Sequence, residues 1–590
     1  MLDVRSLYVT YLSEEERVEA VRGIDFSAEE GKVTGIVGES GSGKSTAMLA
    51  VMGLLDHKAA VEAEKVSLFG NTVRAGDNAA IIFQDPLKCL NPTVKIGRQI
   101  AETVRNRKKC TWREAKKRSE ELLDSVGIRH PRLRMKQYPF ELSGGMRQRV
   151  VIAIALACEP NLIVADEPTT ALDAAMQVRV IRLLKKIVKE TNTALLLVSH
   201  NMGVIAAACD YVYVMKDGKM IENGCADDIF YNPQTEYTKK LLSDATAEQL
   251  LVKEKVFAAQ ENPLFTVRHL KKRFQNEEGV NDVSFDICEG EVFALAGESG
   301  SGKTTLAKIL TGLEQPDSGE VFCRGERVDR KNRKRNKNMH GKVRMIFQDP
   351  YSSLNPCMTI NEMLTETLRA KEKQIKFDQK ERKKDRQRQI EQMLTRVGLS
   401  SLDGKRYPRE LSGGQRQKAA IARALLLEPE LLICDEAVSS LDAATRTQIL
   451  DLLLRVVKEK KIACLFISHD MALIRRISHR TGVLYKGTLA ECAKTRDLCR
   501  DPWHPYTKVL LDSVMPPDPL KARKQKVPAV HEGKSEGGCP YFGSCGHKME
   551  MCKDAAPEMY DFEGRAVSCH LYSKQQRAGR NPNYKMTSQI

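Results

Sequence analysis

The chain has 590 residues, of which 42% are hydrophobic and 29% charged, and this composition excludes a disordered protein. No stretch approaches the roughly 20 apolar residues that a membrane-spanning helix needs, and the N-terminus lacks the pattern of a signal peptide. The net charge of +17 is compatible with an anionic partner, either nucleic acid or the cytoplasmic leaflet of a membrane. We therefore expect a cytosolic protein whose membrane role, if it has one, depends on partner chains.

The first element in chain order is a predicted strand, 32–37, that leads into a glycine-rich loop and a predicted helix, 44–55. The loop reads GESGSGKST and satisfies the pattern GxxxxGK(S/T). Its glycines let backbone N–H groups surround phosphate oxygens at a helix N-terminus, where the helix dipole also favours an anion. The pattern predicts that Lys44 meets the β- and γ-phosphates of a nucleotide and that the Ser45 hydroxyl ligates Mg²⁺.

Two later strands of the first half end in side chains suited to hydrolysis. The apolar run 162–165 precedes Asp166 and Glu167, and the run 194–198 precedes His200. Asp166 is expected to hold Mg²⁺ through water, and Glu167 to polarise the attacking water as a general base. By itself, an acidic pair after an apolar run is also typical of a surface pair, and a lone histidine is usually structural.

The same arrangement recurs in the second half of the chain, with GESGSGKTT, FQDPYSSLNP, ELSGGQRQK, DEAVSSLDAA and FISHDM as its motifs. The offset between copies is 259 residues at the loop lysine, 264 at the FQDP glutamine and 269 from the SGG motif onward. The second copy thus gains residues near the charged stretches 331–338 and 371–388, which we interpret as solvated. Strands alternating with helices in both copies predict two α/β domains, each with a parallel sheet covered on both faces.

The segments LSGGM and LSGGQ complete a set of motifs that resembles the ABC-transporter ATPase family over nearly all of residues 1–515. The resemblance implies two tandem P-loop domains, each with a mixed sheet core and a helical subdomain. It implies that the LSGG helix of each domain completes the nucleotide site of the other, and that Gln84 and Gln348 sense Mg²⁺ and the membrane partner. Met146 and Ala437 depart from the family pattern without removing a phosphate ligand, so we expect two competent sites.

The expected site residues fall into groups by role. Catalysis is assigned to Glu167, Glu436, His200 and His469. Mg²⁺ is assigned to Ser45, Gln84, Asp166, Thr304, Gln348 and Asp435. ATP binding is assigned to Tyr11, Gly38, Ser40, Gly41, Gly43, Lys44, Ser45, Thr46, Gln84, Ser143, Gly144, Gly145, Phe274, Gly297, Ser299, Gly300, Gly302, Lys303, Thr304, Thr305, Gln348, Ser412, Gly413, Gly414 and Gln415. Tyr11 and Phe274 are the expected adenine-stacking aromatics, with a core role open as the alternative for each.

Three further features narrow the resemblance to the oligopeptide, dipeptide and nickel uptake ATPases, with two ATPases fused in one chain. They are FQDP followed by LNP, the segments NPQTEYTKKLL and DPWHPYTKVLL, and the cysteine-bearing tail that begins GCPYFGSC. We expect a first ATP-binding domain at 1–245, a linker at 246–262, a second ATP-binding domain at 263–515 and a C-terminal extension at 516–590.

The extension carries four of the 16 cysteines, and the other twelve are scattered as expected for free thiols in a reducing compartment. These four are Cys539, Cys545, Cys552 and Cys569, and their spacing lacks the CxxC pairs of a structural zinc site. Some members of the resembling subfamily hold a four-iron–four-sulfur cluster on cysteines of this arrangement, which implies such a cluster here. Zinc and unligated thiols are the alternatives.

The resemblance implies an ATP-hydrolysing subunit of an importer, peripheral on the cytoplasmic face of the membrane, that uses ATP and Mg²⁺. Its implied partners are two integral-membrane permease subunits and an extracytoplasmic solute-binding protein, without nucleic acid. The solute is open among peptides, nickel, metallophores and glutathione. The alternative is a soluble tandem ABC ATPase that acts on ribosomes or nucleic acid, which the basic charge suits. Ribosome-acting tandem ABC proteins resemble each other in a long charged helical linker, and DNA-repair ABC proteins carry large zinc-bearing insertions. This sequence has a short linker and no such insertions, which favours transport.

Overall fold

The computed structural model describes residues 1–573 except 13–16, 171, 248–262, 275–276, 328–341, 350–352, 373–378, 440, 442, 526–536 and 563. Most of the expected linker and the charged stretch 331–338 lie outside the described residues. The chain divides into two compact units. Unit 1 comprises Met1–Glu248, Asp442–Ala444 and Met515–Val527, and unit 2 comprises the rest. A search of the described helices finds none with the length and apolar character needed to span a bilayer.

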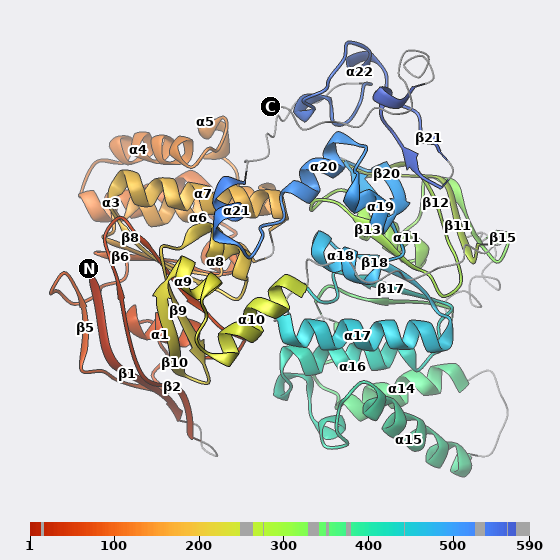
Figure 1. The fold of residues 1–590 in the computed structure, drawn as a ribbon, viewed down its shortest axis with the longest axis horizontal. Coiled ribbons are helices and arrows are strands. Elements are labelled where there is room, and N and C mark those ends of the chain that lie inside the picture. Colours follow the sequence, from red (N-terminus) through yellow and green to blue (C-terminus); the bar gives the residue numbers. More distant parts are fainter. Residues whose placement is uncertain are drawn as a thin grey trace. The chain divides into compact units, whose positions relative to one another are not determined.

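Unit 1 contains two sheets (Figure 1). Its strands are β1 (Leu2–Leu12), β2 (Arg17–Ala28), β3 (Val33–Val37), β4 (Ala59–Glu62), β5 (Lys65–Leu68), β6 (Ala79–Ile82), β7 (Leu162–Asp166), β8 (Ala194–Ser199), β9 (Tyr211–Lys216) and β10 (Lys219–Cys225). The first sheet is antiparallel in the order β2-β1-β4, with β5 also paired to β1. The second has the order β10-β9-β3-β8-β7-β6 and is parallel except for β10. This sheet carries the P-loop and the acidic pair at the carboxyl ends of β3 and β7.

The helices of unit 1 cover the parallel sheet and form a helical subdomain. They are α1 (Lys44–Val51), α2 (Pro86–Cys89), α3 (Ile96–Lys108), α4 (Trp112–Ser125), α5 (Pro131–Arg134), α6 (Gly144–Ala157), α7 (Ala174–Thr191), α8 (Met202–Ala208), α9 (Ala226–Tyr231), α10 (Glu236–Ala247) and α21 (Pro519–Lys524). Helices α3 and α4 pack against each other and against α6, and these three form the helical subdomain (Figure 1). The first helix ends at Val51, four residues before the predicted end.

Unit 2 repeats this architecture. Its strands are β11 (Phe265–Phe274), β12 (Glu277–Ile287), β13 (Val292–Ala296), β14 (Ser318–Cys323), β15 (Glu326–Arg327), β16 (Val343–Ile346), β17 (Leu431–Asp435), β18 (Ala463–Ile467), β19 (Arg480–Tyr485), β20 (Thr488–Lys494), β21 (Tyr560–Asp561) and β22 (Ala566–Val567). One sheet has the order β12-β11-β14-β15, and the other β16-β17-β18-β13-β19-β20-β22-β21. Every residue of β13, β17 and β18 is buried, as in a parallel sheet covered on both faces.

The helices of unit 2 again form a cover and a helical subdomain. They are α11 (Lys303–Leu310), α14 (Ile360–Glu372), α15 (Gln379–Arg396), α16 (Gly413–Leu425), α17 (Ala443–Lys460), α18 (Met471–Ile477), α19 (Thr495–Arg500), α20 (Pro505–Asp512) and α22 (Met551–Asp554). Helices α14 and α15 pack against α16 in the subdomain (Figure 1). The expected fold class, two tandem P-loop domains of mixed α/β architecture with helical subdomains, is confirmed.

The C-terminal residues divide between the two units. Strand β22 pairs with β20 and thereby adds the cysteine-bearing extension to the large sheet of unit 2. The preceding segment, Met515–Val527, belongs instead to unit 1, where α21 packs against α8 and α9. Tyr231 donates a hydrogen bond to Asp518 at 2.9 Å, and Arg523 pairs with Asp227 at 3.3 Å.

Candidate functional site

Each phosphate loop adopts a backbone that only glycine tolerates at one position. Gly43 has φ 98° and Gly302 has φ 102°, both in the left-handed region. A Cβ atom would lie 2.4 Å from the Ala20 carbonyl oxygen at Gly43, and 2.2 Å from the Gly279 carbonyl oxygen at Gly302. The close approach of β2, which carries Ala20, and β12, which carries Gly279, keeps the loops folded around the N-termini of α1 and α11. Phosphate binding requires this loop conformation.

The two loop lysines are buried within their own loops. Lys44 Nζ donates to the carbonyl oxygens of Gly38 at 2.8 Å and Glu39 at 2.7 Å, and Lys303 makes the same contacts with Gly297 and Glu298 at the same distances. The carbonyls thereby hold each ammonium beside the loop at which phosphate oxygens are expected.

An aspartate from the end of a buried strand faces each loop hydroxyl. Ser45 Oγ donates to Asp166 Oδ1 at 3.1 Å, and Thr304 and Asp435 occupy the same positions in the second copy. Burial raises the pKa of both aspartates above the ordinary value. Asp435 Oδ1 is buried and has no hydrogen-bond partner among the described residues. A carboxylate oxygen in this state suits a divalent cation, so the residues present fit Mg²⁺.

The expected general base is held between two side chains in each copy. Glu167 accepts from Gln84 at 3.0 Å and lies 2.7 Å from His200 Nδ1. Glu436 accepts from Gln348 at 2.8 Å and lies 3.0 Å from His469 Nδ1.

Both glutamates have φ 47°, a left-handed conformation that is uncommon for residues other than glycine. Strained backbone of this kind clusters at functional sites, and here it aims the carboxylate at the glutamine and the histidine.

The histidines keep these carboxylates ionised. Burial raises the pKa of Glu167, but hydrogen bonding and the charge of His200 outweigh burial, so the pKa lies below its ordinary value. Glu436 follows the same balance beside His469. Burial lowers the pKa of His469, but Glu436 outweighs burial and the net pKa is raised. A carboxylate ionised at neutral pH is the form that a general base needs.

The LSGG serines cap a helix in each unit. Ser143 accepts from the backbone of Met146 at 3.4 Å at the start of α6, and Ser412 accepts from that of Gln415 at 3.3 Å at the start of α16. Gln415 also accepts from the Ser412 N–H at 2.9 Å, a reciprocal contact that Met146 cannot make. The pairing of each LSGG helix with the loop of the other domain stays a prediction.

The expected adenine-stacking aromatics lie at the ends of β1 and β11. Tyr11 is half-buried and pairs with Val18, two residues before the carbonyl that approaches Gly43. Phe274 is 46% exposed, and its ring lies 2.7 Å from the position of a Cβ on Gly279, which borders Gly302. Both stay candidates for stacking.

Two sets of equivalent residues contact the sites and were not among the predicted site residues. Tyr237 accepts a hydrogen bond from the backbone N–H of Glu39 at 3.1 Å, and Tyr506 accepts one from that of Glu298 at 3.0 Å. Both tyrosines lie in the repeated YTK segments, so their identical offset was the available signal. Thr170 also donates to the Glu167 carboxylate at 3.0 Å, whereas its counterpart Ser439 donates to the Glu436 carbonyl.

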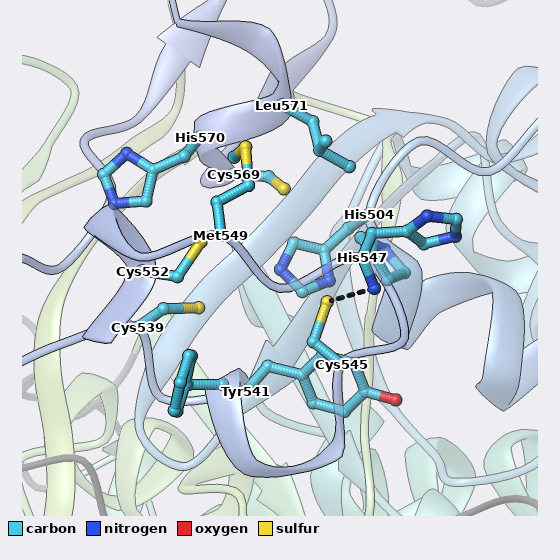
Figure 2. A pocket seen from close by; sticks show the side chains of 12 residues that line it. His504, Cys539, Tyr541, Cys545, His547, Met549, Cys552, Cys569, His570 and Leu571 are labelled. Atoms are coloured by element: carbon cyan, nitrogen blue, oxygen red, sulfur yellow. Dashed lines mark hydrogen bonds between the residues drawn. The ribbon is translucent and has the colours of Figure 1, made fainter.

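The four cysteines of the extension line one pocket, together with Tyr541 and Met549 (Figure 2). Burial is the largest influence raising the pKa of Cys539, Cys545 and Cys569, with Cys569 reaching about 12. Neighbouring cysteines add to each increase, so ionised thiolates here would need a compensating cation. Backbone N–H groups donate to the sulfurs, as that of His547 does to Cys545 at 3.3 Å.

Among the described residues, no three His, Cys, Asp or Glu side chains are grouped so that they could hold a metal ion. The described residues therefore show a grouped ligand set neither for zinc nor for an iron–sulfur cluster. The four thiols that line one pocket do match the number and kind of ligands that a four-iron–four-sulfur cluster takes.

Comparison with known proteins places most of the chain in one family. The pattern of the ABC transporter family matches residues 21–170 and 280–439, and that of the oligopeptide/dipeptide transporter C-terminal region matches residues 490–552. The glutathione import ATP-binding protein GsiA of Escherichia coli (strain K12) is 38% identical over 577 residues, which cover 89% of this chain and 91% of that protein. The protein of the same name from Pectobacterium atrosepticum is 36% identical over 90% of this chain and 92% of its own length.

Among solved structures, the archaeal ribosome recycling factor aABCE1, in complex with the ribosomal stalk protein aP1, aligns with a TM-score of 0.52. The alignment covers 79% of this chain and 86% of that chain at 20% identity, so it shows the fold alone. The sequence matches and the two motif sets show that the chain belongs to the ABC transporter family, with two ATP-binding domains and the C-terminal region of oligopeptide/dipeptide transporters.

Proposed function

We propose that this ATPase drives the uptake of glutathione, di- or oligopeptides, or a related solute through separate permease subunits. The observation that carries the proposal is the identity of 38% to a glutathione import ATP-binding protein, which extends through both ATPase domains and most of the chain. The matched oligopeptide/dipeptide transporter region supports a peptide-like solute independently.

In the proposed reaction, Lys44 and Lys303 leave their loop carbonyls to contact the phosphates of ATP. Glu167 and Glu436 accept a proton from the attacking water, while His200 and His469 fix the carboxylate and meet the γ-phosphate. Mg²⁺, held by Ser45, Asp166 and Gln84 or by Thr304, Asp435 and Gln348, would neutralise charge on the phosphate oxygens. The LSGG serines of the opposite domain would complete each site at a helix N-terminus.

Permease subunits would dock on the helical subdomains beside the glutamine loops. Leu87 on α2 directly follows the Gln84 loop and is 51% exposed. Leu133 and Leu402 occupy equivalent positions in the two copies and are 57% and 67% exposed. These exposed apolar side chains would be the points at which each permease subunit contacts its domain.

The partners and location follow from this proposal. The chain would sit on the cytoplasmic face of the membrane, with two permease subunits above it and an extracytoplasmic solute-binding protein delivering the solute. The similarity to a ribosome recycling factor shows the fold alone, so the alternative of action on ribosomes has less support than import.

Crosslinking tests the docking surface. A Leu87→Cys variant should crosslink to a permease in membranes from cells that express the complete transporter. A Glu62→Cys variant on β4 serves as the control, because it is exposed on the other sheet of unit 1. ATP hydrolysis that rises with glutathione or peptide-loaded binding protein would support the solute class. Absence of the Leu87 crosslink in an intact complex would refute this surface.

We also propose that Cys539, Cys545, Cys552 and Cys569 hold one four-iron–four-sulfur cluster with a structural role. Its support is the pocket that the four thiols share. The cluster would supply a crosslink that orders the extension. Protein purified without oxygen should contain about four iron and four sulfide per chain and absorb near ~400 nm. A Cys552→Ala variant should lose most of the iron, and colourless iron-free protein would exclude the cluster.

A further inference from the structure

A buried tyrosine is hydrogen-bonded to the backbone of the second phosphate loop. Tyr506 is 1% exposed, and its hydroxyl accepts the backbone N–H of Glu298 at 3.0 Å. Glu298 is the loop residue whose carbonyl binds Lys303 at 2.7 Å. The position of the Tyr506 hydroxyl therefore bears directly on the backbone that receives the phosphates.

The cysteine-bearing extension packs against this tyrosine. The ring of Tyr541 lies 5.5 Å from that of Tyr506 and 5.1 Å from that of Tyr485, and the rings of Tyr485 and Tyr506 are 4.5 Å apart. Tyr541 is 5% exposed and lines the cysteine pocket (Figure 2). These three rings form one cluster, the tyrosine triad, that connects the extension to the second phosphate loop.

Polar groups join the same two regions around the triad. Burial raises the pKa of Tyr485 to about 12, and the charge of Glu298 in the loop and that of Cys539 in the extension act in the same direction. A hydrogen bond with Ser544 of the extension acts in the opposite direction. The Tyr485 ring thus contacts both Tyr506, which binds the phosphate loop, and Tyr541 of the cysteine-bearing extension.

The neighbouring histidine is fixed in the same cluster. His504 Nδ1 accepts the backbone N–H of Tyr506 at 3.0 Å, and its ring lies 5.8 Å from that of Tyr541. Burial lowers the pKa of His504 to about 4, so this imidazole is a neutral acceptor.

The first copy keeps the tyrosine but not the triad. Tyr237 accepts the Glu39 N–H in the same way, yet Lys216 stands where the second copy has Tyr485. The Lys216 ammonium lies 5.0 Å from the centre of the Tyr237 ring. The two phosphate loops therefore donate the same hydrogen bond to a tyrosine, but the tyrosine ring packs against Lys216 in the first copy and against Tyr485 in the second.

We propose that Tyr541 is a positioning residue for the second phosphate loop, so that the C-terminal extension sets nucleotide affinity at the Lys303 site through Tyr506 and Tyr485 and leaves the Lys44 site unaffected. The inference rests on the proposed function only in that both loops bind ATP. Aromatic contacts hold the Tyr506 ring in place, and a displaced ring would leave the Glu298 N–H without its acceptor. The loop would then lose order before phosphate binds, which lowers affinity.

The test measures nucleotide binding at each site of the full-length chain. A Lys44→Ala background reports the Lys303 site, and a Lys303→Ala background reports the Lys44 site. Binding of a fluorescent ATP analogue with Mg²⁺ is titrated in both backgrounds for Tyr541→Ala and Tyr541→Phe. Tyr506→Phe and Tyr237→Phe form a matched pair that removes the same hydroxyl beneath each loop.

We expect Tyr541→Ala to raise the Kd of the Lys303 site about 3- to 10-fold. Tyr541→Phe, which keeps the ring, should have a Kd close to that of the unsubstituted chain. The Kd of the Lys44 site should not change in either variant. Tyr506→Phe should weaken only the Lys303 site and Tyr237→Phe only the Lys44 site, each about fivefold.

An unchanged Kd at the Lys303 site in Tyr541→Ala would overturn the proposal. So would equal weakening of both sites, or loss of affinity that Tyr541→Phe does not restore, because each indicates general damage. Failure of both sites of the unsubstituted chain to bind nucleotide would count against the proposed function instead.

Discussion

At the scale of single residues, the buried glutamate–histidine pairs make the nucleotide-free protein sensitive to pH. The pKa of His469 is raised and that of Glu436 is lowered, so both are charged over a window around neutrality. The contribution of His469 is complete below its unfolded pKa of 6.5 and is lost as pH rises through the raised folded value. The contribution of Glu436 is present above 4.5 and is lost as pH falls through its lowered value.

A His469→Gln variant should therefore lose most stability near pH 6 and least at high pH. A loss of about 1 kcal/mol lowers the Tm of a domain of this size by about 2–4 °C. Thermal unfolding from pH 6 to pH 9 without nucleotide measures the difference from the unsubstituted protein, with His57→Gln, 86% exposed, as the control. A difference that grows as pH rises would contradict the ion pair.

The residues that sequence alone could assign are those whose chemistry is complete in a motif. Lys44 and Lys303, like the acidic pairs, recur with the same neighbours, and Ser45 beside Lys44 donates to Asp166 at 3.1 Å. The roles of these residues in the reaction stay predictions. The repeat pairs Tyr506 with Tyr237, but the role of Tyr506 could not be assigned from this signal alone, because it depends on burial against the loop. Tyr541 has no counterpart in the first copy, so the repeat could not reveal it.

At the scale of elements, the two LSGG helices begin with unequal caps. Only α16 has the reciprocal capping box between Ser412 and Gln415, since α6 has Met146 at that position. Met146→Gln should supply the missing contact and stabilise its domain by about 0.5–1 kcal/mol, and Gln415→Met should destabilise the other by a similar amount. Denaturant unfolding of both variants checks the opposite signs. If both substitutions changed the free energy of unfolding in the same direction, the capping box would not explain the difference between the two helices.

A buried ion pair fastens the extension to the second domain. Arg565 lies 2.6 Å from Glu491, which is fully buried, and its guanidinium carbon lies 4.1 Å from the centre of the Trp503 ring. Arg565→Ala leaves the buried Glu491 carboxylate with only the backbone N–H groups of Trp503 and His504 as donors among the described residues. Loss of the cation from a buried pair costs up to about 3–5 kcal/mol. Hydrogen exchange in β22 should rise sharply in this variant.

The double variant Arg565→Met with Glu491→Gln is the control for this pair. It removes both charges and should recover part of the protection, because no buried charge is left alone. Equal exchange in the single variant and the unsubstituted protein would mean that the pair does not hold the strand.

The elements were predicted unevenly from the sequence. Buried strands such as β3 and β7 were predicted within one residue, since an apolar run between turn residues is characteristic. Strands β21 and β22 have two residues each, too few to show a period. They form because β22 pairs with β20 and β21 pairs with β22. The placement of Met515–Val527 in unit 1 depends on long-range packing that no local pattern records.

At the scale of the whole molecule, that segment makes the stability of the first unit depend on residues beyond the second ATPase domain. Ala522 is buried against unit 1, and Arg523 donates to the Cys209 carbonyl at 3.3 Å while pairing with Asp227. An Ala522→Asp variant should therefore raise hydrogen exchange in α8 and α9, because it buries an unpaired charge.

The exposed Lys524→Ala variant is the control and should leave exchange unchanged. Faster exchange confined to α20 and β20 in Ala522→Asp would contradict the assignment of the segment to unit 1.

We expect one chain to carry two competent ATPase sites, each with its own glutamate base. The most direct test is ATP hydrolysis and bound-nucleotide stoichiometry in the full-length variant Glu167→Gln with Glu436→Gln. Removal of a general base costs about 100- to 10,000-fold in rate. We predict at least about a 100-fold loss of turnover with two ATP retained per chain, and hydrolysis near the unsubstituted rate would contradict the account.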